Sequence, residues 1–121
     1  MKIKIKRVYD PWDESDGYRI LIDRLWPRGL KKESLKLDEW AKNLAPSTEL
    51  RKWFNHQPEL FDEFAQKYHV ELQQHEKDLD RVVKIAKTQS VTLLYAASDP
   101  NFNQAVALLG ILNSPFHKSE K

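Results

Sequence analysis

The sequence predicts a small single-domain α/β protein, in which a short mixed or parallel sheet is covered by several helices. Two segments, residues 18–24 and 91–97, resemble buried strands because their consecutive apolar residues leave no polar face. Between them, residues 37–88 place apolar side chains at three- and four-residue spacing, which is typical of helices. A further apolar helical pattern follows residue 100. This alternation of strand, helices, strand and helix is the layout of α/β proteins.

Length and composition favour one domain. The chain has 121 residues, 40% hydrophobic and 31% charged, and a domain of about this length buries roughly two-thirds of its unfolded surface. We expect a single domain over residues 1–115 and a flexible tail over residues 116–121. The chain contains no cysteine, which excludes disulfides and thiolate sites, and no apolar run long enough to cross a membrane. A cytoplasmic protein without a membrane partner is therefore expected.

The first strand is predicted at residues 2–8, where isoleucines alternate with lysines as in a half-buried edge strand. An acidic loop follows. It lacks the twelve-residue calcium pattern and is expected to be solvated; its acidic residues include Asp13, Glu14 and Asp16. Because ten residues are too few for a helical crossover, we expect the strands at 2–8 and 18–24 to run antiparallel, though they need not be neighbours.

Helices are predicted along the middle of the chain. Residues 37–44 favour a short helix, and a second helix begins at Ser47 after a proline. Pro58 suits the first turn of a longer helix that extends to residue 72. The apolar pattern resumes at residues 79–86, after a segment that is either a bend or a solvated continuation. The aromatic and aliphatic positions of these helices are interpreted as core.

The last helix is predicted to begin near Pro100, with Ser98 or Asp99 as its cap. Its apolar residues surround nearly the whole circumference as far as Leu112. A helix of this composition requires cover on most sides. A second copy of the chain is one source of that cover, so a homodimer through this helix is a possible partner arrangement.

The candidate site depends on the direction of the two buried strands. If the strands at 18–24 and 91–97 are parallel, their carboxyl ends lie at one edge of the sheet, where open α/β sheets bind ligands. The segment DRLWPRG (23–29) would then face AASDPNFNQ (96–104), and we call the place where these two segments meet the corner. We expect the two arginines of the first segment to hold a phosphate or carboxylate through paired hydrogen bonds.

The predicted partner is therefore a small anionic ligand. Trp26 would cover an apolar part of it, and polar groups of the second segment would orient it. The full set of predicted ligand-binding residues is Arg24, Trp26, Arg28, Ser98, Asp99 and Asn103. If the corner is catalytic, Asp23 or Asp99 is its candidate general base. The alternative is structural: Asp99 pairs with one of the arginines and closes the corner as a salt bridge.

Two other function classes remain open. Residues 1–32 carry nine Lys or Arg against five Asp or Glu, and such a basic segment is compatible with nucleic-acid binding. The cations for that role are Lys2, Lys4, Lys6, Arg7, Lys31 and Lys32, with Trp12 or Trp26 stacking on bases. A protein-interaction module is the third class. No cofactor or metal is expected, because Gly-rich phosphate loops and metal-ligand spacings are absent from the sequence.

Three blocks of sequence together resemble one family. They are RVYDPWDESDGYRILIDRLWPRG, LDEWAKNLAPSTELRKWFNH and TLLYAASDPNFNQA. In this order they resemble the domain of unknown function 488 family, also called YeaO-like, over about residues 3–112. The resemblance implies a small bacterial or archaeal α/β protein and leaves its function open. It raises the weight of a ligand site, with Arg24, Arg28, Asp99 and Asn103 as the matching positions.

The chain also departs from the pattern of this family. Phe102 stands where members of the same branch often have histidine. More distant relatives have a cysteine after the strand leucines and a Cys-His-Arg set at the start of the last helix. Here Tyr95 and Asn103-Gln104-Ala105 occupy those places. The thiol chemistry that those relatives suggest therefore does not transfer to this chain.

Overall fold

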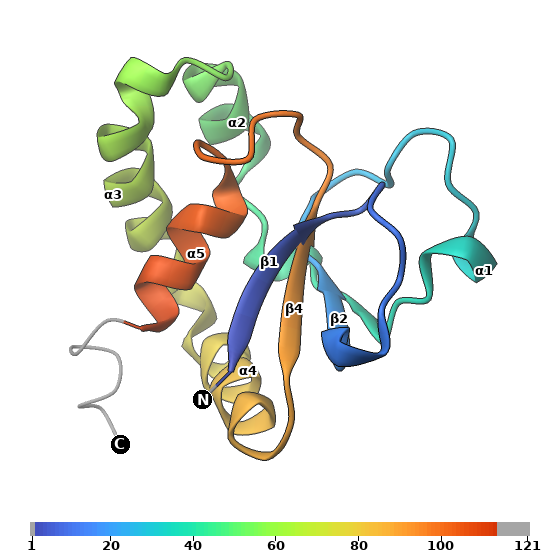
Figure 1. Ribbon diagram of the computed structural model, residues 1–121. Coiled ribbons are helices and arrows are strands. Elements are labelled where there is room, and N and C mark those ends of the chain that lie inside the picture. The colour runs from blue at the N-terminus through green and yellow to red at the C-terminus, as the bar shows by residue number, and fades with distance from the viewer. Residues whose placement is uncertain (1, 114–121) are drawn as a thin grey trace.

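Four parallel strands form one sheet in the order β1-β4-β2-β3 in residues 2–113, which the computed structural model describes (Figure 1). The strands are β1 (Ile3–Arg7), β2 (Tyr18–Leu21), β3 (Glu39–Trp40) and β4 (Val91–Tyr95). The pairing of β2 with β4 confirms that the two buried strands run in the same direction. The predicted tail at 116–121 lies outside the described residues.

Both faces of the sheet are covered, as the consecutive apolar residues of β2 and β4 predicted. The helices are α1 (Lys32–Leu35), α2 (Thr48–Phe54), α3 (Phe61–Leu72), α4 (Glu76–Thr88) and α5 (Gln104–Leu112). Helices α2–α5 cover one face, and α1 with its flanking loops covers the other (Figure 1). The larger core lies between the sheet and α2–α5, and the smaller core lies between the sheet and the α1 side. Along β4, Leu93 packs in the larger core and its neighbour Leu94 packs in the smaller one. This alternation follows from the two-residue period of a strand.

The short helix predicted at residues 37–44 is wrong. This segment forms β3 and a 3₁₀ turn at Lys42–Leu44. Its apolar residues have helical spacing, but they enter different cores: Leu37 and Trp40 pack on the α1 side, and Leu44 packs on the side of α2–α5. Pairing with β2 supplies the backbone hydrogen bonds of the segment, so the strand outweighs its local helical pattern.

The antiparallel arrangement expected for β1 and β2 is also wrong. Both strands run parallel to β4, which lies between them. The connection at residues 8–17 returns along the α1 face without a helix of its own beyond a 3₁₀ turn at Glu14–Asp16 (Figure 1). Ten extended residues reach about 33 Å, whereas a five-residue strand is about 17 Å long. An extended return is therefore long enough to make the two strands parallel.

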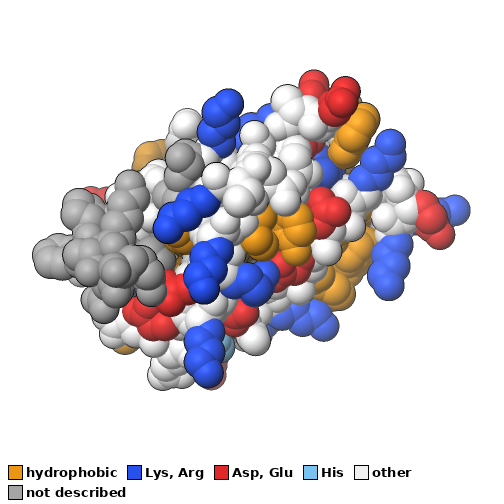
Figure 2. Space-filling view, turned by 90° about the horizontal axis from the view of Figure 1, so that it is seen from below, with side chains coloured by type: hydrophobic (Ala, Val, Ile, Leu, Met, Phe, Trp, Pro, Cys, Tyr) orange, Lys and Arg blue, Asp and Glu red, His pale blue; other side chains and the backbone are white. Residues whose placement is uncertain are grey.

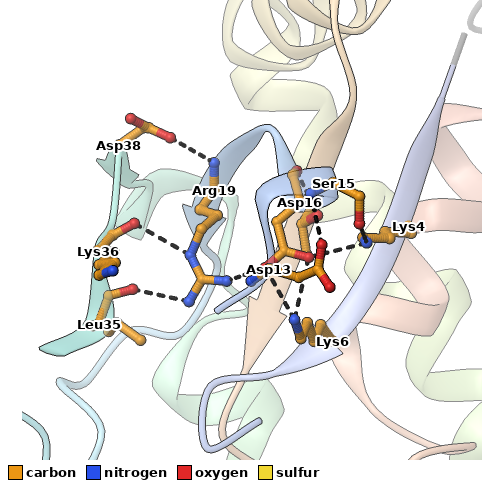
Figure 3. Close-up of polar contacts among 10 residues, drawn as sticks. Lys4, Lys6, Asp13, Ser15, Asp16, Arg19, Leu35, Lys36 and Asp38 are labelled. Carbon is orange, nitrogen blue, oxygen red and sulfur yellow. Dashed lines mark hydrogen bonds and ion pairs between the residues drawn. The ribbon is translucent and has the colours of Figure 1, made fainter. Parts of the chain in front are cut away.

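Asp16 holds this connection on the sheet through the contacts drawn in Figure 3. It is buried, whereas the sequence predicted a solvated acidic loop. Its carboxylate accepts hydrogen bonds from Lys6 Nζ at 3.0 Å and Arg19 Nη1 at 2.5 Å, and it pairs with Lys4 at 3.0 Å. Burial alone raises the pKa of Asp16, but the hydrogen bonds from the two lysines outweigh it and hold the pKa well below its usual range. Arg19 also donates to Leu35 O at 2.9 Å, which joins α1 to the same network.

Helix α5 begins at Gln104, later than predicted, because Asn103 caps it. The Asn103 Oδ1 atom accepts a hydrogen bond from Val106 N at 3.0 Å. The chain itself covers most of the apolar surface of this helix through α3, β1 and β4. Its apolar composition therefore does not require a second copy, and the homodimer stays a prediction. Within residues 2–113, no helix combines the length and the apolar character needed to span a bilayer.

Candidate functional site

A cleft of about 290 Å³ lies at the carboxyl end of the sheet, between the two predicted corner segments. Residues 23–28 after β2 line one part, and residues 96–97 and 102–104 after β4 line another. The end of α2 and neighbouring side chains complete the lining with Tyr9, Pro46, Arg51, Phe54, His56 and Phe64. The parallel strand arrangement thus brings the two corner segments to one cleft.

Asp23 is a partly buried carboxyl group in this cleft. Its Oδ2 atom accepts a hydrogen bond from Ala96 N at 2.9 Å, and its Oδ1 atom accepts one from Gln104 Nε2. Burial raises the pKa of Asp23 to about 6, although the Ala96 N–H and the positive charge of Arg51 act in the opposite direction. Asp23 therefore links the ends of β2 and β4 to the start of α5 and changes charge near pH 6.

Arg24 lines the cleft, but most of its guanidinium group is engaged by the backbone. Its Nε donates to Pro46 O and its Nη2 donates to Ala45 O, both at 3.1 Å. These bonds attach the end of β2 to the segment before α2. The salt bridge considered as the structural alternative does not form, since Asp99 pairs with neither Arg24 nor Arg28 among the described residues. Arg24 thus positions the backbone and leaves Nη1 as its remaining donor nitrogen.

Trp26 and Arg28 also line the cleft, in different environments. The Trp26 Nε1 donates to Leu30 O at 2.6 Å, and its ring packs edge-on against Trp40 with centroids 5.2 Å apart. Trp26 therefore belongs largely to the smaller core. Arg28 is exposed, and the Tyr9 hydroxyl donates to its carbonyl oxygen at 2.9 Å, which fixes the backbone of the turn.

The predicted residues after β4 have mostly structural contacts. Ser98 and Asp99 are not among the described residues that line the cleft. The Asp99 carboxylate accepts hydrogen bonds from Asn101 N at 2.9 Å and Phe102 N at 3.2 Å, which shapes the loop before α5. Asn103 does line the cleft. Its amide donates to Asp99 O at 2.8 Å while its Oδ1 caps α5, so both ends of this side chain are engaged.

Two cationic or titratable cleft residues were missed by the sequence reasoning, Arg51 and His56. Arg51 lies in the last turn of α2, and His56 follows the helix in a left-handed conformation with φ of 55°. The sequence pattern indicated functional residues only at the strand ends, whereas helix α2 reaches the same edge of the sheet. The block LRKWFNH, part of the family resemblance, was the signal that contained both residues.

Three of the six cations proposed for nucleic-acid binding are engaged within the chain. Lys4 and Lys6 bind Asp16, and Arg7 donates to the carbonyl oxygens of Ala96 and Ala97. Figure 2 shows the end of the molecule opposite the cleft, where Lys and Arg side chains are interspersed with Asp and Glu. These contacts leave fewer free cations for a phosphate backbone, and nucleic-acid binding stays a prediction. The described residues contain no group of three or more metal-ligating side chains placed to hold an ion.

Comparisons with known proteins agree with the resemblance seen in the sequence. A family model described as "Inactive DUF488-N3 subclade" matches residues 2–121. The chain is 53% identical over 114 residues to the uncharacterized protein YeaO of Escherichia coli, covering 94% of this chain and 99% of that protein. It is 39% identical over 112 residues to the uncharacterized protein Rv3073c of Mycobacterium tuberculosis, covering 93% of this chain and 94% of that protein. No solved structure shows significant similarity to the chain.

Proposed function

The chain belongs to the inactive DUF488-N3 subclade, and from this premise we propose that it binds a small ligand with a phosphate or carboxylate group. The ligand occupies the cleft at the carboxyl end of the sheet. The observation that carries the proposal is the presence of Arg24, Arg28 and Arg51 around one cleft, where Asp23 is the single acidic residue among the described residues that line it. The description of the subclade as inactive favours binding over catalysis.

The charges of two of these arginines support an anionic ligand. Neither Arg28 nor Arg51 forms an ion pair with a carboxylate of the described residues. Both arginines line a cleft whose lining residues carry a net positive charge even when Asp23 is ionised. Charge-assisted hydrogen bonds from arginine to phosphate or carboxylate are about twice as strong as neutral ones. An anion in the cleft is therefore attracted by this positive charge and gains strong hydrogen bonds.

The shape of the cleft supports a small ligand. Its volume of about 290 Å³ is near the lower end of the range of roughly 300–1,000 Å³ that is typical of ligand pockets. Ala96 and Ala97 have short side chains, which let a ligand approach the backbone at the end of β4. Phe54 and Phe64 contribute apolar surface on the side of the larger core.

Thermal unfolding in the presence of inorganic phosphate, phosphorylated metabolites, nucleotides and carboxylates tests this proposal. Arg28→Ala and Arg51→Ala each remove one cleft cation. Lys52→Ala removes a cation from the adjacent exposed position of α2, outside the cleft, and is the matched control. At 100 times its dissociation constant, a ligand adds about 2.7 kcal/mol to stability. We expect that gain in the parent and in Lys52→Ala, and its loss in both arginine variants.

Two results would contradict the proposal. The first is a parent protein that none of these anions stabilises. The second is a stabilisation that Arg28→Ala and Arg51→Ala retain in full, because the anion then binds elsewhere. Arg24 is unsuitable for this test, since its hydrogen bonds to Ala45 O and Pro46 O make its replacement a structural change as well.

A further inference from the structure

We propose that the anionic group of the ligand is attached to an aromatic ring, and that an exposed apolar rim of the cleft binds this ring. The inference rests on the proposed function, since it concerns the same cleft. The apolar rim consists of Tyr9, Leu25 and Phe102, which are 43%, 63% and 37% exposed. These are three of the six large hydrophobic residues that are exposed within the described chain.

The position of the apolar rim is what distinguishes it from ordinary surface residues. Single exposed apolar side chains are normal on soluble proteins, whereas a group of them marks a binding surface. The three residues come from separate segments, after β1, after β2 and before α5, and all of them line a cleft that three arginines also line. Apolar and cationic groups side by side suit a ligand that has an apolar part and an anionic part.

Two residues of the apolar rim are held in place by specific contacts. The Tyr9 hydroxyl donates to Arg28 O, so the tyrosine and the cation-bearing turn are fixed relative to each other. The Phe102 backbone N–H binds the Asp99 carboxylate, and the Phe102 ring packs edge-on against Phe61 with centroids 5.4 Å apart. The rim is therefore preorganised, which lowers the entropic cost of binding a ring.

Trp26 is less suited to this task than the apolar rim. Its Nε1 is bonded to Leu30 O and its ring packs on Trp40, so much of its surface is engaged inside the protein. We therefore assign contact with the apolar part of the ligand, which the sequence predicted for Trp26, to the apolar rim. The cleft volume of about 290 Å³ suits a ligand of about one ring with one anionic group, since it lies near the lower end of the roughly 300–1,000 Å³ range of ligand pockets.

Calorimetric titrations with phenyl phosphate and methyl phosphate test the inference, because the two esters share the anionic group and differ in the ring. A favourable aromatic contact contributes about 0.5–1.5 kcal/mol, so we expect phenyl phosphate to bind up to about tenfold more tightly. Phe102→Ala and Leu25→Ala should each reduce this preference, because they weaken phenyl phosphate binding more than methyl phosphate binding. Val70→Ala is the matched control, because Val70 is also 63% exposed but lies on α3 outside the cleft.

The outcomes separate the inference from the proposed function. Equal affinities for the two esters in the parent would overturn the aromatic ring and leave the anion site standing. A preference that both Phe102→Ala and Leu25→Ala retain would overturn the assignment to the apolar rim. Failure of both esters, and of benzoate and acetate, to bind at millimolar concentration would overturn both proposals. Leu25→Ala gives the independent reading if Phe102→Ala melts early through loss of its contact with Phe61.

Discussion

Replacement of Asp23 by asparagine should remove a pH-dependent loss of stability that this cleft imposes on the fold. Asparagine has nearly the same shape and keeps an oxygen to accept the hydrogen bond from Ala96 N. The side-chain amide of Gln104, which now donates to Asp23, can rotate so that its oxygen accepts from the new amide. The variant therefore removes the titrating proton while keeping the contacts between the strand ends and α5.

The size of the expected change in folding stability follows from the pKa of Asp23. Burial raises this pKa from 3.8 to about 6 in the folded protein. At 1.36 kcal/mol per pH unit, ionising Asp23 in the folded state costs roughly 3 kcal/mol. Between these two values the unfolded chain has released the proton while the folded protein still binds it. Stability from this group is thus lost as pH rises from about 4 to about 6, and it is constant above that range.

Urea unfolding of the parent and Asp23→Asn at pH 4 and pH 7 measures this effect. The variant should gain roughly 2 kcal/mol relative to the parent between the two pH values, because the unfolded carboxyl is already partly ionised at pH 4. Asp62→Asn, on the exposed surface of α3, controls for the removal of one carboxylate from the protein. If the parent and Asp23→Asn differ in stability by the same amount at both pH values, burial does not dominate the pKa of Asp23.

Three further predictions concern the network, the backbone and the cleft. Asp16→Ala should destabilise the protein by about 3–5 kcal/mol, because it leaves the buried Arg19 charge without its carboxylate. Urea unfolding measures this loss, and a loss below about 1 kcal/mol would contradict the prediction. Gly17→Ala should lower the melting temperature, since its φ is +63° and a Cβ atom would lie 2.2 Å from a backbone oxygen. Gly110→Ala, in the open part of α5, should instead stabilise the protein by about 0.5–1 kcal/mol. Equal changes in melting temperature for the two variants would contradict this prediction. Anion affinity should fall as pH rises through 6, because ionised Asp23 repels the ligand, and an identical fall in Asp23→Asn would show that other groups cause it.

The sequence predicted the parts of the fold that depend on burial. Consecutive apolar residues identified β2 and β4, and helical spacing identified α2 to α4. The errors arose where tertiary contacts outweighed local pattern. Residues 37–44 pair with β2 although their apolar spacing is helical, and the connection at 8–17 returns along the sheet because Asp16 binds cations from β1 and β2. A buried charge network of this kind has no period in the sequence, so it is indistinguishable there from a solvated acidic loop.

The location of the candidate site was predictable from the sequence, whereas the residues that line it were predictable only in part. Parallel strands required the segments after β2 and β4 to meet, and the structure places Arg24, Trp26, Arg28 and Asn103 on the cleft. Their hydrogen-bond partners were not predictable, because the acceptors of Arg24 are backbone carbonyls of a distant segment. The contribution of α2 was not predictable from strand topology, since the orientation of a helix depends on packing between distant residues.

The most direct test of the anion cleft is the change in backbone amide NMR shifts when inorganic phosphate is added to the labelled protein. We expect the largest shifts at amides around the cleft, at Arg28, Ala96, Ala97 and Gln104, and we expect Arg51→Ala to reduce them. Shifts confined to the lysines at the opposite end of the sheet would contradict the anion cleft. The absence of any shift at millimolar phosphate would contradict it as well.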